Sequence, residues 1–264
     1  MHINQFDSAA EARPLSRRLF VAAGAVALGG VFAAAGCVGS PAEAPETALS
    51  ASDDAAGAEA SPALTADTLP KPDPDPESPF GVDKNINMET IDEYLNIPGV
   101  AYRDARMLRD PAQYEEIGGH ANLEMALEGF RIVPFPLVGT LQELPVSGAY
   151  TGERLFDVTW GADGTVAQAV PRFEESRQIL EDLFPSDRPV MIMCGAGGYA
   201  GMTRQLLIAL GWDPDLLYNV GGQWDYTGYH PVQFISYDAD GTPHFMFWRA
   251  DYADIDFDAL TPIE

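Results

Sequence analysis

Cysteine and histidine are scarce in this sequence, with 2 Cys and 4 His among 264 residues. Two cysteines cannot form the set of disulfides that stabilises a small secreted domain. The few cysteines and histidines also argue against a structural zinc site, because such a site takes four ligands, mostly cysteine and histidine. The sequence also lacks a glycine-rich dinucleotide fingerprint and a P-loop. We therefore expect a fold that rests on a hydrophobic core, with no metal and no cofactor.

Positive charge is also scarce, since 15 Lys and Arg stand against 40 Asp and Glu, for a formal net charge of −25. Nucleic-acid binding and docking on anionic lipid headgroups both need clustered cations, so the composition argues against either. The length admits one domain of generous size, or one domain with non-globular ends.

The chain opens with basic residues followed by an apolar stretch. Arg17 and Arg18 resemble the pair of a twin-arginine export signal, and residues 19–36 are rich in Ala, Gly and Val. The stretch ends at Cys37 after small residues, which resembles a bacterial lipobox, where the cysteine is lipidated and becomes the new N-terminus. We predict a signal peptide over residues 1–36 and a lipid anchor on Cys37.

An ordinary cleaved signal and an uncleaved membrane anchor are the alternatives for this segment. The apolar stretch has 18 residues, at the lower edge of what spans a bilayer. Each alternative places the body of the protein outside the cytoplasm.

A tract of Ala, Pro, Glu, Asp, Ser and Thr follows, with almost no aromatic residue as far as Phe80. Such a composition buries too little apolar area to offset the entropy lost on ordering. Its proline-rich end at residues 71–76 favours an extended chain. We therefore predict a lipidated cysteine and a disordered linker over residues 37–84, and one folded domain over residues 85–264.

Apolar spacing in the folded part predicts strands that alternate with helices. Helices are expected at residues 88–95, 111–117, 173–184 and 201–210, and strands at residues 100–106, 130–135, 189–193 and 216–220. The continuous apolar run at 189–193 is typical of a strand buried on both faces of a parallel sheet. The predicted fold class is α/β, a mostly parallel sheet with helices on both faces.

Two Asp-Gly turns interrupt this alternation. Asp163-Gly164 lies between apolar segments at 155–160 and 165–170, and Asp240-Gly241 lies between 234–237 and 244–248. Both patterns predict β-hairpins added to the core sheet. The additions are an insert over about residues 139–170 and a C-terminal hairpin over about residues 232–250.

Cys194 comes directly after the buried strand and begins a loop that leads into a helix. The loop residues are Gly195, Ala196, Gly197, Gly198 and Tyr199. Ligand sites occur at the carboxyl ends of parallel strands, and small residues let successive amides turn inward as an anion nest. Together with the helix N-terminus, such amides should lower the thiol pKa and bind a persulfide or a small oxyanion. The alternative is an inert core cysteine beside glycines that serve packing alone.

The order of these features resembles the rhodanese-like family. Residues 193–201 stand where that family has its active-site loop, and the strand at 216–220 follows at the family's usual spacing. Upstream, residues 103–106 resemble its V-D-x-R strand end, and residues 111–120, ending at His120, resemble its E-x-x-x-G-H stretch. The resemblance covers about residues 85–230, apart from the insert.

The resemblance implies a rhodanese-like fold and sulfurtransferase chemistry. Cys194 would take sulfur from a donor such as thiosulfate and pass it, as a persulfide, to a thiophilic acceptor. Residues 195–199 would bind the persulfide, and Arg106 would assist electrostatically. Arg106 could equally form a structural pair with Asp104, because a buried charge needs a partner.

Two positions depart from related loop patterns. Tyr199 stands where an arginine is frequent in active members of the family, so the loop has no cation. The sixth residue after Cys194 is Ala200, which argues against a phosphatase loop of the C-x5-R type.

We therefore predict an exported, membrane-tethered sulfurtransferase on the outer face of the cell membrane. Its partners would be a small sulfur donor, a thiophilic acceptor, an envelope protein and, through the lipid, the membrane. The alternative, favoured by the cation-free loop, is a catalytically silent rhodanese-like module that binds a partner or senses oxidation of Cys194.

Overall fold

The structure is a computed structural model that describes residues 64–107, 125–142, 150 and 152–264. The predicted export signal, Cys37, most of the linker and the stretch from 111 to His120 lie outside these residues. Within the described ranges, no helix has the length and apolarity needed to cross a membrane.

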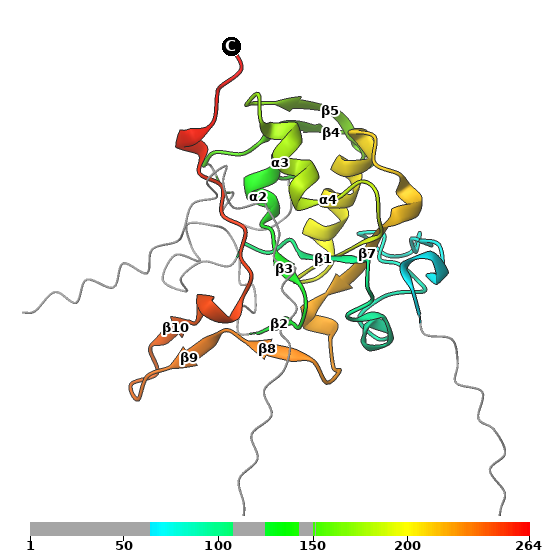
Figure 1. The fold of residues 1–264 in the computed structure, drawn as a ribbon, viewed down its shortest axis with the longest axis vertical. Helices are drawn as coiled ribbons and strands as arrows, with labels where there is room; N and C mark the ends of the chain where they lie inside the picture. The colour runs from blue at the N-terminus through cyan, green and yellow to red at the C-terminus, as the bar shows by residue number, and fades with distance from the viewer. Residues whose placement is uncertain (1–63, 108–124, 143–149, 151) are drawn as a thin grey trace, which may run out of the picture. The chain divides into compact units, whose positions relative to one another are not determined.

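A four-stranded parallel sheet lies at the centre of the fold, with the strand order β3-β1-β6-β7 (Figure 1). The strands are β1 (Ala101–Asp104), β3 (Arg131–Ile132), β6 (Val190–Cys194) and β7 (Leu217–Gly222). The predicted α/β class and the parallel sheet are confirmed. The strand expected at 130–135 is short, because it ends at Ile132 and helix α2 begins three residues later, after Pro134.

The side chains of β6 alternate between two hydrophobic clusters, one on each face of the sheet. Val190, Ile192 and Cys194 belong to one cluster, and Met191 and Met193 belong to the other. All five residues are buried, which explains why the apolar run is continuous.

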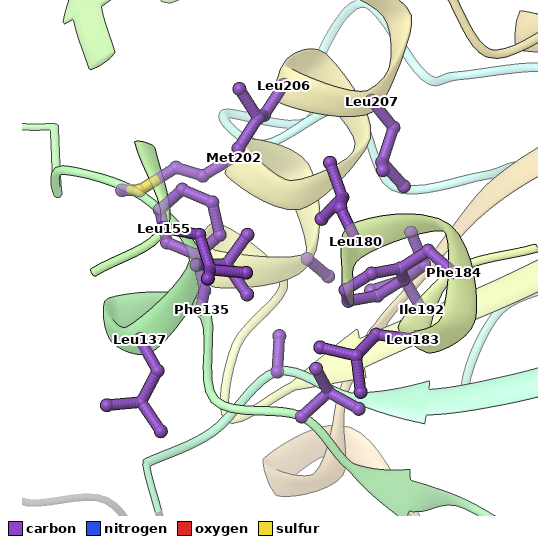
Figure 2. Close-up of a cluster of buried hydrophobic side chains, with 14 of the residues drawn as sticks. Phe135, Leu137, Leu155, Leu180, Leu183, Phe184, Ile192, Met202, Leu206 and Leu207 are labelled. Carbon is purple, nitrogen blue, oxygen red and sulfur yellow. The ribbon is translucent and has the colours of Figure 1, made fainter. Parts of the chain in front are cut away.

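Three helices cover the face to which Cys194 points. They are α2 (Phe135–Val138), α3 (Ser176–Leu183) and α4 (Gly198–Ala209). Figure 2 shows Leu180 and Leu183 of α3 grouped with Ile192 of β6, while Leu206 of α4 lies beside Met202 in the same cluster. This cluster is the main core of the domain.

The face to which Met191 and Met193 point was also predicted to carry helices, but the structure covers it differently. Residues 88–95 form only a 3₁₀ turn at Ile91–Tyr94, and Ile86, Ile91 and Phe130 pack on the sheet there. The turn cannot continue as a helix because Asn96 takes a left-handed φ of 58° and Pro98 follows. Among the described residues, α-helices therefore cover one face of the sheet.

Three antiparallel strand pairs complete the fold. They are β4 (Phe156–Trp160) with β5 (Val166–Pro171), β9 (Ile235–Tyr237) with β10 (Pro243–Phe245), and β2 (Met125–Leu127) with β8 (Pro231–Gln233). Both predicted hairpins are thus confirmed, and Gly164 and Gly241 have the positive φ that their turns require. The β4–β5 hairpin contributes Leu155, Phe156 and Val158 to the main core, so this insert is part of the domain's packing. Strands β8 to β10 lie on the side of the sheet away from the helices (Figure 1).

Further short turns of 3₁₀ helix lie between these elements. Their bounds are Ala66–Thr68, Pro214–Leu216, Gln223–Asp225, Phe247–Arg249 and Phe257–Ala259.

Residues 64–84, which composition assigned to the linker, have defined positions in the fold. Residues 73–84, here called the strap, form a narrow loop in which the Asp75 amide donates to the Val82 carbonyl at 2.8 Å. The buried Asp83 carboxylate accepts the amides of Asn85 and Ile86, each at 2.8 Å. Backbone and carboxylate hydrogen bonds stabilise the strap. The lack of apolar residues, from which we predicted disorder, therefore does not indicate disorder here.

Leu206 is fully buried between α4 and the sheet, whereas Ile263 is 49% exposed near the C-terminus. We expect Leu206→Ala to lower the free energy of unfolding by about 2–5 kcal/mol, because it leaves a cavity in the main core. Ile263→Ala is the control and should change it by less than about 0.5 kcal/mol. Urea denaturation measures both, and equal losses would contradict this assignment of the core.

Candidate functional site

Cys194 is the last residue of β6, and its side chain lies at the carboxyl end of the parallel sheet. Helix α4 begins at Gly198, three residues earlier than the spacing of apolar residues predicted. Gly197 precedes the helix with a φ of 89°, a left-handed conformation that glycine adopts without strain. The predicted succession of strand, loop and helix is therefore confirmed.

Backbone amides of this loop surround the sulfur. The amide of Gly197 donates to the Cys194 Sγ at 3.1 Å. Backbone hydrogen bonds from Ala200, Ala196 and Tyr199 also stabilise the thiolate and act to lower its pKa. The loop is thus an amide cradle centred on one sulfur atom.

Burial nevertheless raises the pKa of the Cys194 thiol above its usual value. The residue is 4% exposed, and the loss of hydration outweighs the backbone hydrogen bonds. The negative charge of Asp104 raises the pKa further. The expectation of a lowered thiol pKa was therefore wrong, because the same packing that aims the amides at the sulfur also excludes water.

Arg106 is 2% exposed and forms an ion pair with Asp104. Its Nε donates to both carboxylate oxygens of Asp104 at 3.0 Å, and its Nη1 lies 3.4 Å from Oε1 of Gln223. These contacts favour the structural alternative for Arg106. A buried ion pair of this kind is costly to break, because either charge left alone is poorly solvated.

The ion pair lies close to the cysteine loop. Asp104 is the register partner of Met193 in the sheet, and Gln223 follows Gly222, the register partner of Cys194. The pair therefore joins the carboxyl ends of β1 and β7 on either side of the strand that carries Cys194.

Asn219 is a site residue that sequence reasoning missed. It is buried in β7, where its Nδ2 donates to the carbonyl oxygens of Phe80 at 2.8 Å and of Gly197 at 3.1 Å. Its Oδ1 accepts the amide of Gly221 at 3.1 Å. The only sequence signal was a single amide side chain inside an otherwise apolar strand.

Strand β7 and the cysteine loop pack closely against each other at Gly222. A Cβ atom on Gly222 would lie 2.0 Å from the carbonyl oxygen of Gly195, so no larger residue fits without movement of the backbone. That carbonyl accepts the amide of Trp224 at 3.0 Å. Gly222 thus determines how near the loop can approach the sheet.

Two aromatic side chains flank the loop. The Trp224 ring would lie 3.0 Å from a Cβ on Gly195, and the Phe80 ring of the strap would lie 3.5 Å from one on Gly198. Trp224 is 51% exposed and Phe80 is 37% exposed, so both rings form the outer rim of the site. The packing of Phe80 also shows why the strap belongs to this site.

No family model, curated protein or solved structure matches this chain. The site combines a buried thiol, amides that surround its sulfur, an ion pair close to the cysteine loop and an aromatic rim. Within the described ranges, no three histidine, cysteine or acidic side chains are close enough together to hold a metal ion.

We expect Gly222→Ala to destabilise the protein by about 1–3 kcal/mol, because its methyl group would overlap the Gly195 carbonyl. Gly211→Ala is the matched control, since Gly211 has a φ of 97° but nothing within 4 Å of its Cβ position. The control should lose only about 1 kcal/mol, from backbone strain alone. Thermal unfolding compares the two, and a larger loss for Gly211→Ala would contradict the close approach.

The raised thiol pKa predicts slow alkylation of Cys194. Because the native thiol stays protonated where a free thiol of pKa about 8.5 ionises, iodoacetamide should modify it more slowly in the native than in the urea-unfolded protein. The native rate should also rise at a higher pH than the unfolded rate. Peptide mass spectrometry over a pH series measures this, and a native midpoint below that of the unfolded chain would refute it.

Proposed function

We propose that this protein is an exported sulfurtransferase with a rhodanese-like domain, in which Cys194 carries sulfur as a persulfide. The observation that carries the proposal is the amide cradle, with the Gly197 amide 3.1 Å from Sγ at the carboxyl end of β6. Several amides on one sulfur suit an anionic or polarised sulfur species. A purely structural cysteine requires no such donors.

The proposed transfer has two balanced steps. The Cys194 thiol and a donor R–S–SH give Cys194–S–SH and R–SH, as an S–S bond forms at Cys194 and the donor's S–S bond breaks. The proton of the Cys194 thiol passes to the departing R–S⁻. An acceptor such as cyanide then takes the outer sulfur as thiocyanate, and Cys194 returns to a thiol.

The charges around the sulfur favour a persulfide donor over thiosulfate. Thiosulfate is a dianion, and the net charge of −25 repels it at long range. The Arg106 guanidinium already binds Asp104, and Tyr199 supplies no positive charge in the loop. An organic persulfide carries less charge, and its organic part can contact the rings of Phe80 and Trp224.

The proposal includes the anchoring expected from the sequence. Arg17 and Arg18 would direct export, and lipidation of Cys37 would tether the domain to the outer face of the membrane. The donor and the acceptor, including any envelope protein that serves as one, would then be met outside the cytoplasm.

A second candidate is a rhodanese-like module without turnover, which binds a partner or senses oxidation of Cys194. The observation that favours it is burial, because Cys194 is 4% exposed and its pKa is raised. A protonated, covered thiol attacks and oxidises slowly, so burial favours the partner-binding form of this candidate over oxidation sensing.

Mass spectrometry of the full chain separates the two candidates. We expect a persulfide with an uncharged apolar body, such as benzyl persulfide, to add one sulfur atom to the Cys194 peptide, and cyanide to remove it as thiocyanate. Thiosulfate should load the same peptide less, for the electrostatic reasons above. In the unprocessed full chain Cys37, the other of the 2 cysteines, keeps a free thiol and is the internal comparison.

The Cys194→Ser variant should lose thiocyanate formation and keep its circular dichroism spectrum. Thiocyanate formation that survives this substitution would refute the role of Cys194. No loading from either donor, in a folded sample, would favour the module without turnover.

A further inference from the structure

A cavity of about 480 Å³ lies at the amino ends of the parallel strands, opposite the end that carries Cys194. Gly99, Pro189 and Leu216 line it, and they come shortly before β1, β6 and β7 respectively. Residues 66–71, which lead into the strap, contribute the rest of its wall together with neighbouring charged residues. The volume is within the roughly 300–1,000 Å³ of common ligand sites.

Part of the cavity wall is apolar. Leu69 and Leu216 line it and are half-buried, so each keeps apolar surface that a ligand in the cavity can cover. Tyr218, also in the wall, is buried, and its hydroxyl donates to the Pro70 carbonyl at 2.8 Å. This bond fixes the segment that contains Leu69 against the sheet, so the wall is formed before any ligand binds.

Two cations at the cavity have donors that solvent reaches. Lys71 is 80% exposed and forms an ion pair with Asp215. Arg188 is 48% exposed and forms an ion pair with Asp187. An ammonium group has three N–H donors and a guanidinium group has five. Asp215 takes one donor of Lys71, and Asp187 takes two of Arg188, so each cation has further donors for a ligand.

Asp67 supplies an acceptor to the same cavity. It is exposed, and its carboxylate has no hydrogen-bond or ion-pair partner within the part of the chain that the structure describes. A carboxylate in this state can accept charge-assisted hydrogen bonds from an ammonium group. The cavity therefore offers open donors and an open acceptor around an apolar wall.

We propose that this cavity binds a small apolar zwitterion, an amino acid or a dipeptide whose amino and carboxyl groups are both free. The ligand carboxylate accepts hydrogen bonds from Lys71 and Arg188, and the ligand ammonium donates to Asp67. The apolar side chains of the ligand cover Leu69 and Leu216, which removes apolar surface from water.

The mixed charges of the cavity favour a zwitterion over an ion of one sign. The carboxylates of Asp67, Asp187 and Asp215 repel a simple anion, and the net charge of −25 adds a long-range repulsion. The positive charges of Lys71 and Arg188 repel a simple cation. A ligand that carries both charges has a partner of opposite sign for each of them.

Calorimetric titration of the full chain with the dipeptide leucyl-leucine tests the proposal. N-acetyl-leucyl-leucine lacks the ammonium and leucyl-leucinamide lacks the carboxylate, and each should bind about two- to fivefold more weakly, as expected for the loss of one exposed charge pair. Glycyl-glycine keeps both charges without the apolar body, and it should bind at least about tenfold more weakly.

Variants locate each end of the ligand. Lys71→Gln should weaken the binding of leucyl-leucine about two- to fivefold but should not weaken that of leucyl-leucinamide, which has no carboxylate to lose. Asp67→Asn should weaken leucyl-leucine by a similar factor but should not weaken N-acetyl-leucyl-leucine, which has no ammonium. Arg154→Gln is the matched control, since Arg154 pairs with Asp157 outside the cavity, and it should leave every affinity unchanged.

The proposal is overturned if leucyl-leucine does not bind, if either single-charge derivative binds as tightly, or if Lys71→Gln and Asp67→Asn leave its affinity unchanged. Circular dichroism checks that the variants fold, and the comparison of the four ligands decides without any variant. The cavity lies at the end of the sheet opposite Cys194, so the outcome is independent of sulfur transfer.

Discussion

The amide side chain of Asn219 is the interaction on which the arrangement of the cysteine site depends. It holds the strap through the Phe80 carbonyl, the cysteine loop through the Gly197 carbonyl, and the bend of β7 through the Gly221 amide. The strap is far in sequence from the other two segments, and it also contacts the cysteine loop through the Phe80 ring. An apolar residue of similar size would leave two carbonyl groups and one amide without these bonds in a buried place, where unpaired polar groups are costly.

The sequence predicted those features that depend on local patterns. The apolar run of β6, the Asp-Gly hairpins and the loop from Cys194 to α4 follow from spacing and turn chemistry, and the structure contains them. Features that depend on tertiary packing could not be read in this way. The raised pKa of Cys194 results from a competition between loop amides and burial, and only the amides leave a sequence signature. The strap was missed because its order comes from backbone hydrogen bonds and one aromatic ring.

The arginines of the sheet region are paired in two contrasting ways. Arg106 has an acidic partner two residues away, and both oxygens of Asp104 accept its Nε. Arg103 and Arg131 face each other across neighbouring strands with uncharged acceptors and a largely solvated carboxylate. The first arrangement adds rigidity at the carboxyl end of the sheet. The second leaves a local positive field in a protein whose total charge is strongly negative.

The strap also has a mechanical consequence. Residues 64–72 lead directly into it, and the Pro70 carbonyl is held by the Tyr218 hydroxyl at 2.8 Å. A pulling force on the chain ahead of residue 64 would therefore load these few bonds first and peel the strap, one bond at a time. The parallel strands, which are bonded along their length, would be loaded only afterwards. Because the Phe80 ring lies on the cysteine loop, tension would uncover this loop while the sheet remains folded.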